Sequence, residues 1–270
     1  MQYRRTQVIS SQFSEALRGI TVDQKDRIYA AGDSQVKVFD AAGALLQQWA
    51  TFKPAFSVAV AGDGAVYAGE AGQVEIFSGG GKLLNTWRDP ERLGQVTAIG
   101  FFQTDVLVAD SRDRCLRRYD RNGKFLNDIG KDNRMKGFLI PNGVLDFSVD
   151  SKGIIHAANP GKHRVERYTR EGKLLGHIGR FDGIDPEGFT GCCNPTNVAV
   201  VGADRIYVTE KAGPRAKVLD FSGKLIAVIA ADAFNEAAKN MDIAVDSRGR
   251  VFVAETVRRE IMVFERAGNP

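Results

Sequence analysis

The sequence predicts an all-β fold, a six-bladed β-propeller of one domain spanning residues 1–270, and three observations support this prediction. A unit of strands joined by short turns recurs along the chain, with a Gly-centred turn at the same place each time. Six such turns occur at a mean separation of 45 residues, so six units fill all 270 residues. Val, Ile, Tyr and Phe dominate each unit with period-two alternation and without helical periodicity. A four-stranded repeat of ~40–50 residues is typical of propeller blades.

Each unit is predicted to begin with a short apolar strand that ends in an Asp/Gly-type turn. These strands read GITVDQKD, SVAVAGDG, VTAIGFFQ, DFSVDSKG, NVAVVGAD and DIAVDSRG, starting at Gly19, Ser57, Val96, Asp146, Asn197 and Asp242. The first and last units show the next elements well, with RIYAAGDSQVKVFDAAGALL from Arg27 and RVFVAETVRREIMVFERAGN from Arg250. In both, two strands flank a short loop, and a Gly turn then leads towards a fourth strand.

The turn glycines make the count of blades objective. They are Gly43, Gly81, Gly123, Gly172, Gly223 and Gly268, separated by 38, 42, 49, 51 and 45 residues. The last unit ends directly after its turn and lacks a fourth strand, whereas the first residues, RTQVISSQF, supply a strand without a unit. We therefore expect the N-terminal strand to complete the sixth blade, which closes the ring and removes two open sheet edges.

Composition narrows the class of protein. The chain is 43% apolar, 9% aromatic and 26% charged, with a net charge of +4, which is typical of globular proteins and excludes disorder and coiled coil. No apolar run approaches the ~18 residues of a membrane span. Three cysteines are too few for a disulfide scaffold. No signal peptide is visible, so the compartment stays open, and it is periplasmic or extracellular if such a peptide has been removed.

The units resemble NHL repeats. VLVADSRDRCLRRYDRNGKFL and IAVDSRGRVFVAETVRREIMVFERAG carry the Asp/Gly turn, β-rich strand, basic residue and second Gly turn of that family. NPGKHRVERYTREGK, and GFTGCCNPTN together with EKAGPRAKV, are similar to a bacterial subgroup of uncharacterised NHL-repeat proteins. The resemblance implies a six-bladed propeller but no particular reaction, because such propellers include lyases, lactonases, RNA readers and scaffolds.

The uneven period indicates where the propeller works. Loops between second and third strands, and loops between blades, lie at one end of the ring, which we call the top. The period grows mainly through the interblade loops 131–145 and 180–196. Long loops on a rigid scaffold often carry binding residues, so the top of blades 4 and 5 is the predicted site.

The predicted site contains an adjacent cysteine pair. Cys192 and Cys193 are interpreted either as a redox-active vicinal disulfide or soft-metal ligands near His163, or as small apolar residues, with or without a disulfide, that anchor the loop. Glu210 and Lys211 face this loop, so Lys211 could bind an anion or form a solvated ion pair with Glu210. The candidate ligand-binding residues are Asn159, His163, Cys192, Cys193, Asn194, Glu210 and Lys211.

A second candidate lies at the mouth of the central channel. Asp146, Asn197 and Asp242 begin the first strands of consecutive blades, and their oxygens could hold Ca²⁺ or another divalent metal. The alternative is that these side chains bind their own backbone at the strand start. A lactonase-like hydrolase would use the same three residues, with Glu210 as a base.

Other activities are less well supported by the sequence. The three histidines, His156, His163 and His177, belong to one blade, which argues against a lyase whose three metal ligands come from different blades. The basic run SRDRCLRRYDRNGK could bind RNA, but interspersed Asp residues favour a solvated blade edge. We therefore expect a module that binds a small molecule or protein on its top face. The alternatives are a metal-assisted hydrolase or lyase and, third, an RNA-binding propeller; no catalytic residue is assigned.

Overall fold

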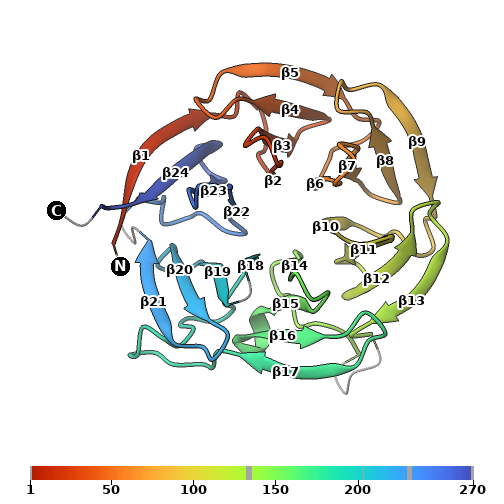
Figure 1. Ribbon diagram of the computed structural model, residues 1–270. Coiled ribbons are helices and arrows are strands. Elements are labelled where there is room, and N and C mark those ends of the chain that lie inside the picture. Colours follow the sequence, from red (N-terminus) through yellow and green to blue (C-terminus); the bar gives the residue numbers. More distant parts are fainter. Residues whose placement is uncertain (1, 132–135, 203, 230–232, 269–270) are drawn as a thin grey trace.

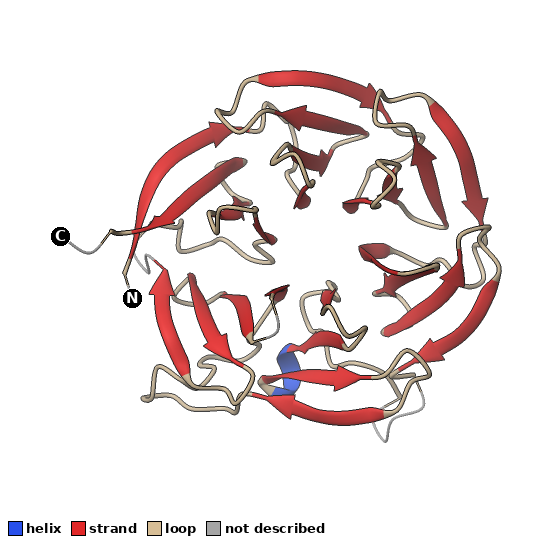
Figure 2. Cartoon of the chain, viewed as in Figure 1, coloured by secondary structure: helices blue, strands red, loops and turns tan. Residues whose placement is uncertain are grey.

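The computed structural model describes residues 2–131, 136–202, 204–229 and 233–268, which form six four-stranded antiparallel sheets arranged in a ring (Figure 1). One 3-10 turn, η1 (Pro160–Lys162), interrupts the strands and loops (Figure 2). The prediction of an all-β six-bladed propeller is confirmed. Within the described residues, no helix is long and apolar enough to cross a membrane.

Within each blade, the four strands are ordered from the central channel to the rim. The innermost strands are β2 (Gly19–Val22), β6 (Ser57–Val60), β10 (Val96–Phe102), β14 (Phe147–Val149), β18 (Asn197–Val201) and β22 (Ile243–Val245). The second strands are β3 (Ile28–Gly32), β7 (Val66–Gly69), β11 (Asp105–Asp110), β15 (Ile155–Asn159), β19 (Arg205–Glu210) and β23 (Val251–Glu255). The third strands are β4 (Gln35–Phe39), β8 (Gln73–Phe77), β12 (Cys115–Asp120), β16 (Arg164–Tyr168), β20 (Arg215–Asp220) and β24 (Glu260–Arg266). The outermost strands are β5 (Leu45–Ala50), β9 (Leu83–Arg88), β13 (Phe125–Ile129), β17 (Leu174–Ile178), β21 (Leu225–Ile229) and β1 (Tyr3–Ser10).

The N-terminal strand closes the ring as predicted. Strand β1 pairs with β24 in a sheet ordered β1-β24-β23-β22, so blade 6 joins both ends of the chain (Figure 1). The pairing runs from Tyr3 opposite Arg266 to Ser10 opposite Glu260. Ile9 is buried in the core between blades 6 and 1, so closure combines hydrogen bonding with apolar burial.

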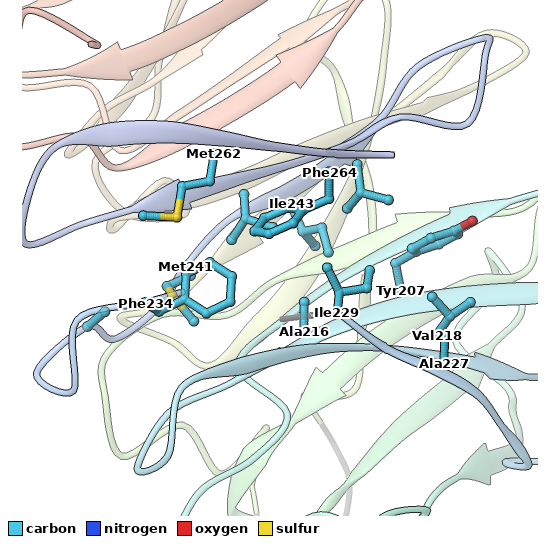
Figure 3. Packing of buried hydrophobic residues seen from close by; sticks show 13 residues of the cluster. Tyr207, Ala216, Val218, Ala227, Ile229, Phe234, Met241, Ile243, Met262 and Phe264 are labelled. Carbon is cyan, nitrogen blue, oxygen red and sulfur yellow. The ribbon is translucent and has the colours of Figure 1, made fainter. Parts of the chain in front are cut away.

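The hydrophobic core consists of six layers, one between each pair of neighbouring blades. Figure 3 shows the layer between blades 5 and 6, where Tyr207 and Ile229 pack with Ile243, Met262 and Phe264. This arrangement follows from the alternation of the sequence, because opposite faces of each sheet pack against different neighbours. The innermost ends of the strands are thereby held at fixed positions around the channel.

The Gly turns pack against the preceding blade. Gly81 has φ +82°, and an added Cβ would lie 2.7 Å from Trp49 in β5 of blade 1. Gly123 has φ +84°, and a Cβ there would lie 2.8 Å from Trp87 in β9 of blade 2. The recurring glycine therefore meets two demands at once, a left-handed turn and close approach to a neighbouring indole.

Candidate functional site

Three polar side chains meet at the channel mouth. Asp146, Asn197 and Asp242 lie at the start of the innermost strands of blades 4, 5 and 6; Asp146 and Asn197 are buried, and Asp242 is partly buried. The Asn197 side chain lies near both carboxyl groups and lowers the pKa of each. The structure therefore brings together the three residues that the sequence analysis selected from equivalent positions in consecutive blades.

Both acids also bind backbone N–H groups at the start of a strand. The N–H of Val198 donates to Asp146 Oδ2 at 2.7 Å, which connects blade 4 to blade 5. The N–H of Ile20 donates to Asp242 Oδ2 at 2.7 Å, which connects blade 6 to blade 1. Asp242 Oδ1 accepts a further bond, of 2.8 Å, from the N–H of Ile243. The acids thus bind their own backbone, as the structural interpretation expects, and they also join neighbouring blades.

Burial raises the pKa of both carboxyl groups. It raises the pKa of Asp242 to about 6, and burial together with the nearby Asp242 carboxyl raises the pKa of Asp146 well above its usual value. Below the mouth, the channel contains a cavity of about 280 Å³ lined mostly by aliphatic residues such as Val58 and Val200. The mouth therefore resists the accumulation of two negative charges.

The cysteine loop is clamped to the top of blade 5 by Asn194. Its Oδ1 accepts a 2.8 Å hydrogen bond from the N–H of Lys211, and its Nδ2 donates to the Lys211 carbonyl at 2.9 Å and to the Thr190 carbonyl at 2.7 Å. The Asn194 side chain is fully buried. Because Asn194 holds both Lys211 and Thr190, it fixes the cysteines relative to the lysine.

The two adjacent cysteines lie in different environments. Cys192 is exposed, whereas Cys193 is buried, and neither forms a disulfide. The Cys193 thiol donates to Cys192 Sγ over 3.3 Å. Lys211, only 8% exposed, lies within hydrogen-bonding range of Cys192 and also donates from Nζ to Asn142 Oδ1 at 2.7 Å. The interpretation of both cysteines as buried loop anchors therefore applies to Cys193 alone.

Glu210 does not form the predicted solvated ion pair with Lys211. It is buried and forms salt bridges with Arg215 and with Lys217, whose Nζ lies 2.7 Å from Glu210 Oε1. Lys217 Nζ also donates to the carbonyls of Pro186 and Gly188, at 3.1 and 2.6 Å. Through Lys217, these buried salt bridges anchor the loop 180–196. A catalytic base needs a free carboxylate, whereas the Glu210 carboxylate is already paired with Arg215 and Lys217.

Asn159 and His163 take structural places in blade 4. Asn159 is buried at the end of β15, where its Oδ1 accepts a hydrogen bond from the N–H of Leu139. His163 has φ +53°, and its ring packs edge-on against Phe181 of the loop 180–196, with 4.8 Å between ring centroids. His163 thus contacts the loop that carries the cysteines. Of the predicted top loop 131–145, residues 132–135 lie outside the described residues.

The arginine run of blade 3 is not simply a solvated edge. Arg117 is almost fully buried and forms salt bridges with Asp110, Asp113 and Asp128. The sequence interpretation was wrong for this residue because one side of β12 faces the interior of the sheet stack. Arg118 is also paired, with Asp105, so little of this positive charge is available to a phosphate backbone.

Among the described residues, neither the histidines nor the acids gather into a metal-binding group. His156, in strand β15, is buried, and its Nε2 lies 3.1 Å from Oδ2 of Asp150 in the turn before that strand. Across the part of the chain that the structure describes, no group of three or more His, Cys, Asp or Glu side chains could hold a metal ion.

One pattern of buried polar pairs escaped the sequence analysis. In blades 2 to 5, a buried polar residue at or directly after the top end of the second strand faces a partner on the third strand. The pairs are Glu70–Glu75, Asp110–Arg117, Asn159–Glu166 and Glu210–Lys217. Alignment of the repeats shows these positions, but only the structure shows that blade 2 places two acids together.

Comparison with known proteins supports the fold alone. No protein-family model matches the sequence, and no curated protein matches it. A streptogramin B lyase structure matches with a TM-score of 0.68 at 12% identity and covers 98% of both chains. A catalytically inactive virginiamycin B lyase from Staphylococcus aureus with quinupristin matches with a TM-score of 0.65 at 10% identity, over 98% of this chain and 100% of that one.

A different propeller is about equally similar. The WD40 β-propeller domain of Doa1 matches with a TM-score of 0.64 at 12% identity, over 98% of this chain and 97% of that one. The chain is a β-propeller. An enzyme and a WD40 domain resemble it to the same degree, so the fold is compatible with catalysis and with binding, and the site must decide between them.

Proposed function

We propose that this chain is an NHL-type propeller that binds a ligand or partner through the top face of blades 4 and 5. The observation that carries the proposal is the anchored loop 180–196. Lys217 holds it from beneath, and its own Asn194 binds the backbone of Lys211, both through buried polar contacts. The loop thus presents the exposed Cys192 beside the largely buried Lys211. A loop fixed in this way keeps its binding groups preorganised, which lowers the entropic cost of association.

The chemistry of the face indicates a mixed ligand. Lys211 supplies a cation and Asn142 supplies an amide, while Phe181 and Ile184 of the same loop are 62% and 96% exposed. Exposed large apolar side chains on a loop held by buried contacts are typical of recognition surfaces. An anionic small molecule at Lys211, or a protein that covers Ile184, fits this combination.

Thermal-shift measurements with small carboxylates, phosphates and sulfates test the anionic case. We expect at least one to stabilise the wild type and the Lys82→Met control, since Lys82 is exposed on a bottom turn. The Lys211→Met variant should lose that shift. Stabilisation that is equal in both variants would contradict binding at blades 4 and 5.

A metal-assisted hydrolase at the channel mouth is the second candidate. It is favoured by one observation, the convergence of Asp146, Asn197 and Asp242 at the mouth of the channel cavity. In this case the three side chains would hold the ion, which would polarise a substrate carbonyl. Against it, both Asp242 oxygens already accept backbone hydrogen bonds, so they are poor ligands without rearrangement. Elemental analysis of the purified protein distinguishes the two candidates.

A further inference from the structure

The adjacent thiols have the geometry of an attacking and a resolving cysteine. Cys192 is exposed, so an oxidant can reach its sulfur, whereas Cys193 is 6% exposed. The two sulfur atoms are 3.3 Å apart, with Cys193 as the hydrogen-bond donor. The second thiol therefore already lies next to the first.

The surroundings activate only the exposed thiol. The Cys193 hydrogen bond and the Lys211 ammonium lower the pKa of Cys192, whereas burial raises the pKa of Cys193. Lys211 is held in place by the Asn194 clamp on its backbone and by Asn142 on its ammonium. The difference between the thiols therefore rests on a fixed constellation.

We propose that Cys192 and Cys193 form a peroxide-reactive dithiol, in which Cys192 is oxidised first and Cys193 then closes a disulfide between adjacent residues. This modification site goes beyond the proposed binding function and does not depend on which ligand the top face takes. Cys115 supplies an internal contrast, since it is fully buried and burial raises its pKa to about 12.

The two steps balance with hydrogen peroxide as the oxidant. The Cys192 thiolate attacks one peroxide oxygen, the O–O bond breaks, and Cys192 becomes a sulfenic acid while hydroxide leaves and is protonated to water. Cys193 sulfur then attacks Cys192 sulfur and displaces the hydroxyl, which leaves as water with the Cys193 proton. Overall, two thiols and one peroxide give one disulfide and two waters.

The product is expected to be easily reversed. Adjacent Cα atoms are about 3.8 Å apart across a trans peptide, below the usual range of disulfides, so the bond is strained and readily reduced. Closure also removes the thiolate next to Lys211. The charge of the top face would therefore change with the redox state.

Peroxide treatment followed by thiol counting tests this inference. Purified wild type is treated with hydrogen peroxide, unfolded in N-ethylmaleimide and analysed by intact mass and peptide mapping. We expect three alkylated cysteines before treatment, as in the free-thiol structure, and only Cys115 alkylated afterwards, with dithiothreitol restoring the other two. The Cys115→Ser variant should still form the disulfide.

Two variants separate the roles. Cys193→Ser should stop at a Cys192 sulfenic acid that dimedone traps, and Lys211→Met should slow oxidation at neutral pH, because the Cys192 thiolate loses the neighbouring ammonium. The pH dependence of iodoacetamide alkylation in the wild type gives the same information without a variant, with an inflection below that of an ordinary thiol. Three alkylatable thiols after treatment, disulfides between separate chains, or an ordinary alkylation profile would overturn the proposal.

Discussion

The buried acid pair of blade 2 makes stability depend on pH in a defined direction. Glu70 and Glu75 are both buried, and Glu70 Oε2 accepts hydrogen bonds from the N–H of Lys53 at 3.0 Å and from Gln73 Nε2 at 2.7 Å. Burial, and then the Glu75 carboxyl, raise the pKa of Glu70 from 4.5 to about 8. At neutral pH Glu70 is therefore protonated in the folded chain and can donate a hydrogen bond to Glu75.

The size of the effect follows from that shift. The unfolded chain loses the Glu70 proton near pH 4.5, whereas the folded chain keeps it until about pH 8. The contribution of Glu70 to stability is therefore complete below pH 4.5, falls as the pH rises, and is lost above pH 8. A shift of that size corresponds to about 5 kcal/mol, because each unit corresponds to ~1.4 kcal/mol.

Glu70→Gln isolates this contribution. Glutamine keeps an acceptor for Lys53 and a donor for Glu75 but cannot ionise, so the other titrating groups cancel in the difference between variant and wild type. Thermal melts from pH 5 to 8.5 should show the variant gaining relative to the wild type, by about 10 °C at the upper end, since 1 kcal/mol corresponds to roughly 2 °C in a chain of this size.

The equivalent position of blade 5 is the matched control. Glu210→Gln leaves the buried Lys217 ammonium without its carboxylate, and we expect a loss of about 3–5 kcal/mol. The same substitution should thus have opposite effects in two blades. A constant difference between Glu70→Gln and the wild type across this pH range would refute the shared-proton interpretation.

Three further predictions concern closure, the loop and the channel mouth. Deletion of residues 1–13 removes β1 and exposes the edge of β24, so the melting temperature should fall by at least 10 °C, about 5 kcal/mol or more; unchanged stability would disprove ring closure. Lys217→Met should speed proteolysis within 180–196, because the Gly188 carbonyl and Glu210 lose their partner, and equal cleavage in the exposed Lys224→Met control would contradict this. Calcium should not raise the melting temperature of chelator-treated protein, since Asp242 already accepts backbone hydrogen bonds through both oxygens; a calcium-dependent rise would support the hydrolase.

The sequence predicted the features that the repeat determines. The turn glycines predicted six blades, and the unpaired strand at the N-terminus predicted the pairing of β1 with β24. Equivalent positions also pointed to the meeting of Asp146, Asn197 and Asp242. These predictions succeed because each depends only on a residue's position within its blade. All six blades have the same strand order, so equivalent residues lie at the same height and depth around the ring.

The repeat pattern could not predict which polar side chains pair with one another, either within a blade or between loops. Glu210 faces Lys217 rather than its chain neighbour Lys211, because successive residues of a strand point to opposite faces. Arg117 was interpreted as solvated, although it lies inside the sheet stack with three acids. The contact of Asn142 with Lys211 joins two loops 69 residues apart and depends on their path in space.

The buried polar pairs at the top of the blades connect these observations to function. In blades 3 and 5 the pair is an acid with a base, and the blade 5 pair also supports the loop 180–196 through Lys217. In blade 2 the pair consists of two acids, which bind the N–H groups of Phe52 and Lys53 in the loop between blades 1 and 2. One repeated position therefore positions a top loop in two different blades. The top face therefore combines one loop held by an acid–base pair with another held by two acids, of which Glu70 has a pKa raised to about 8.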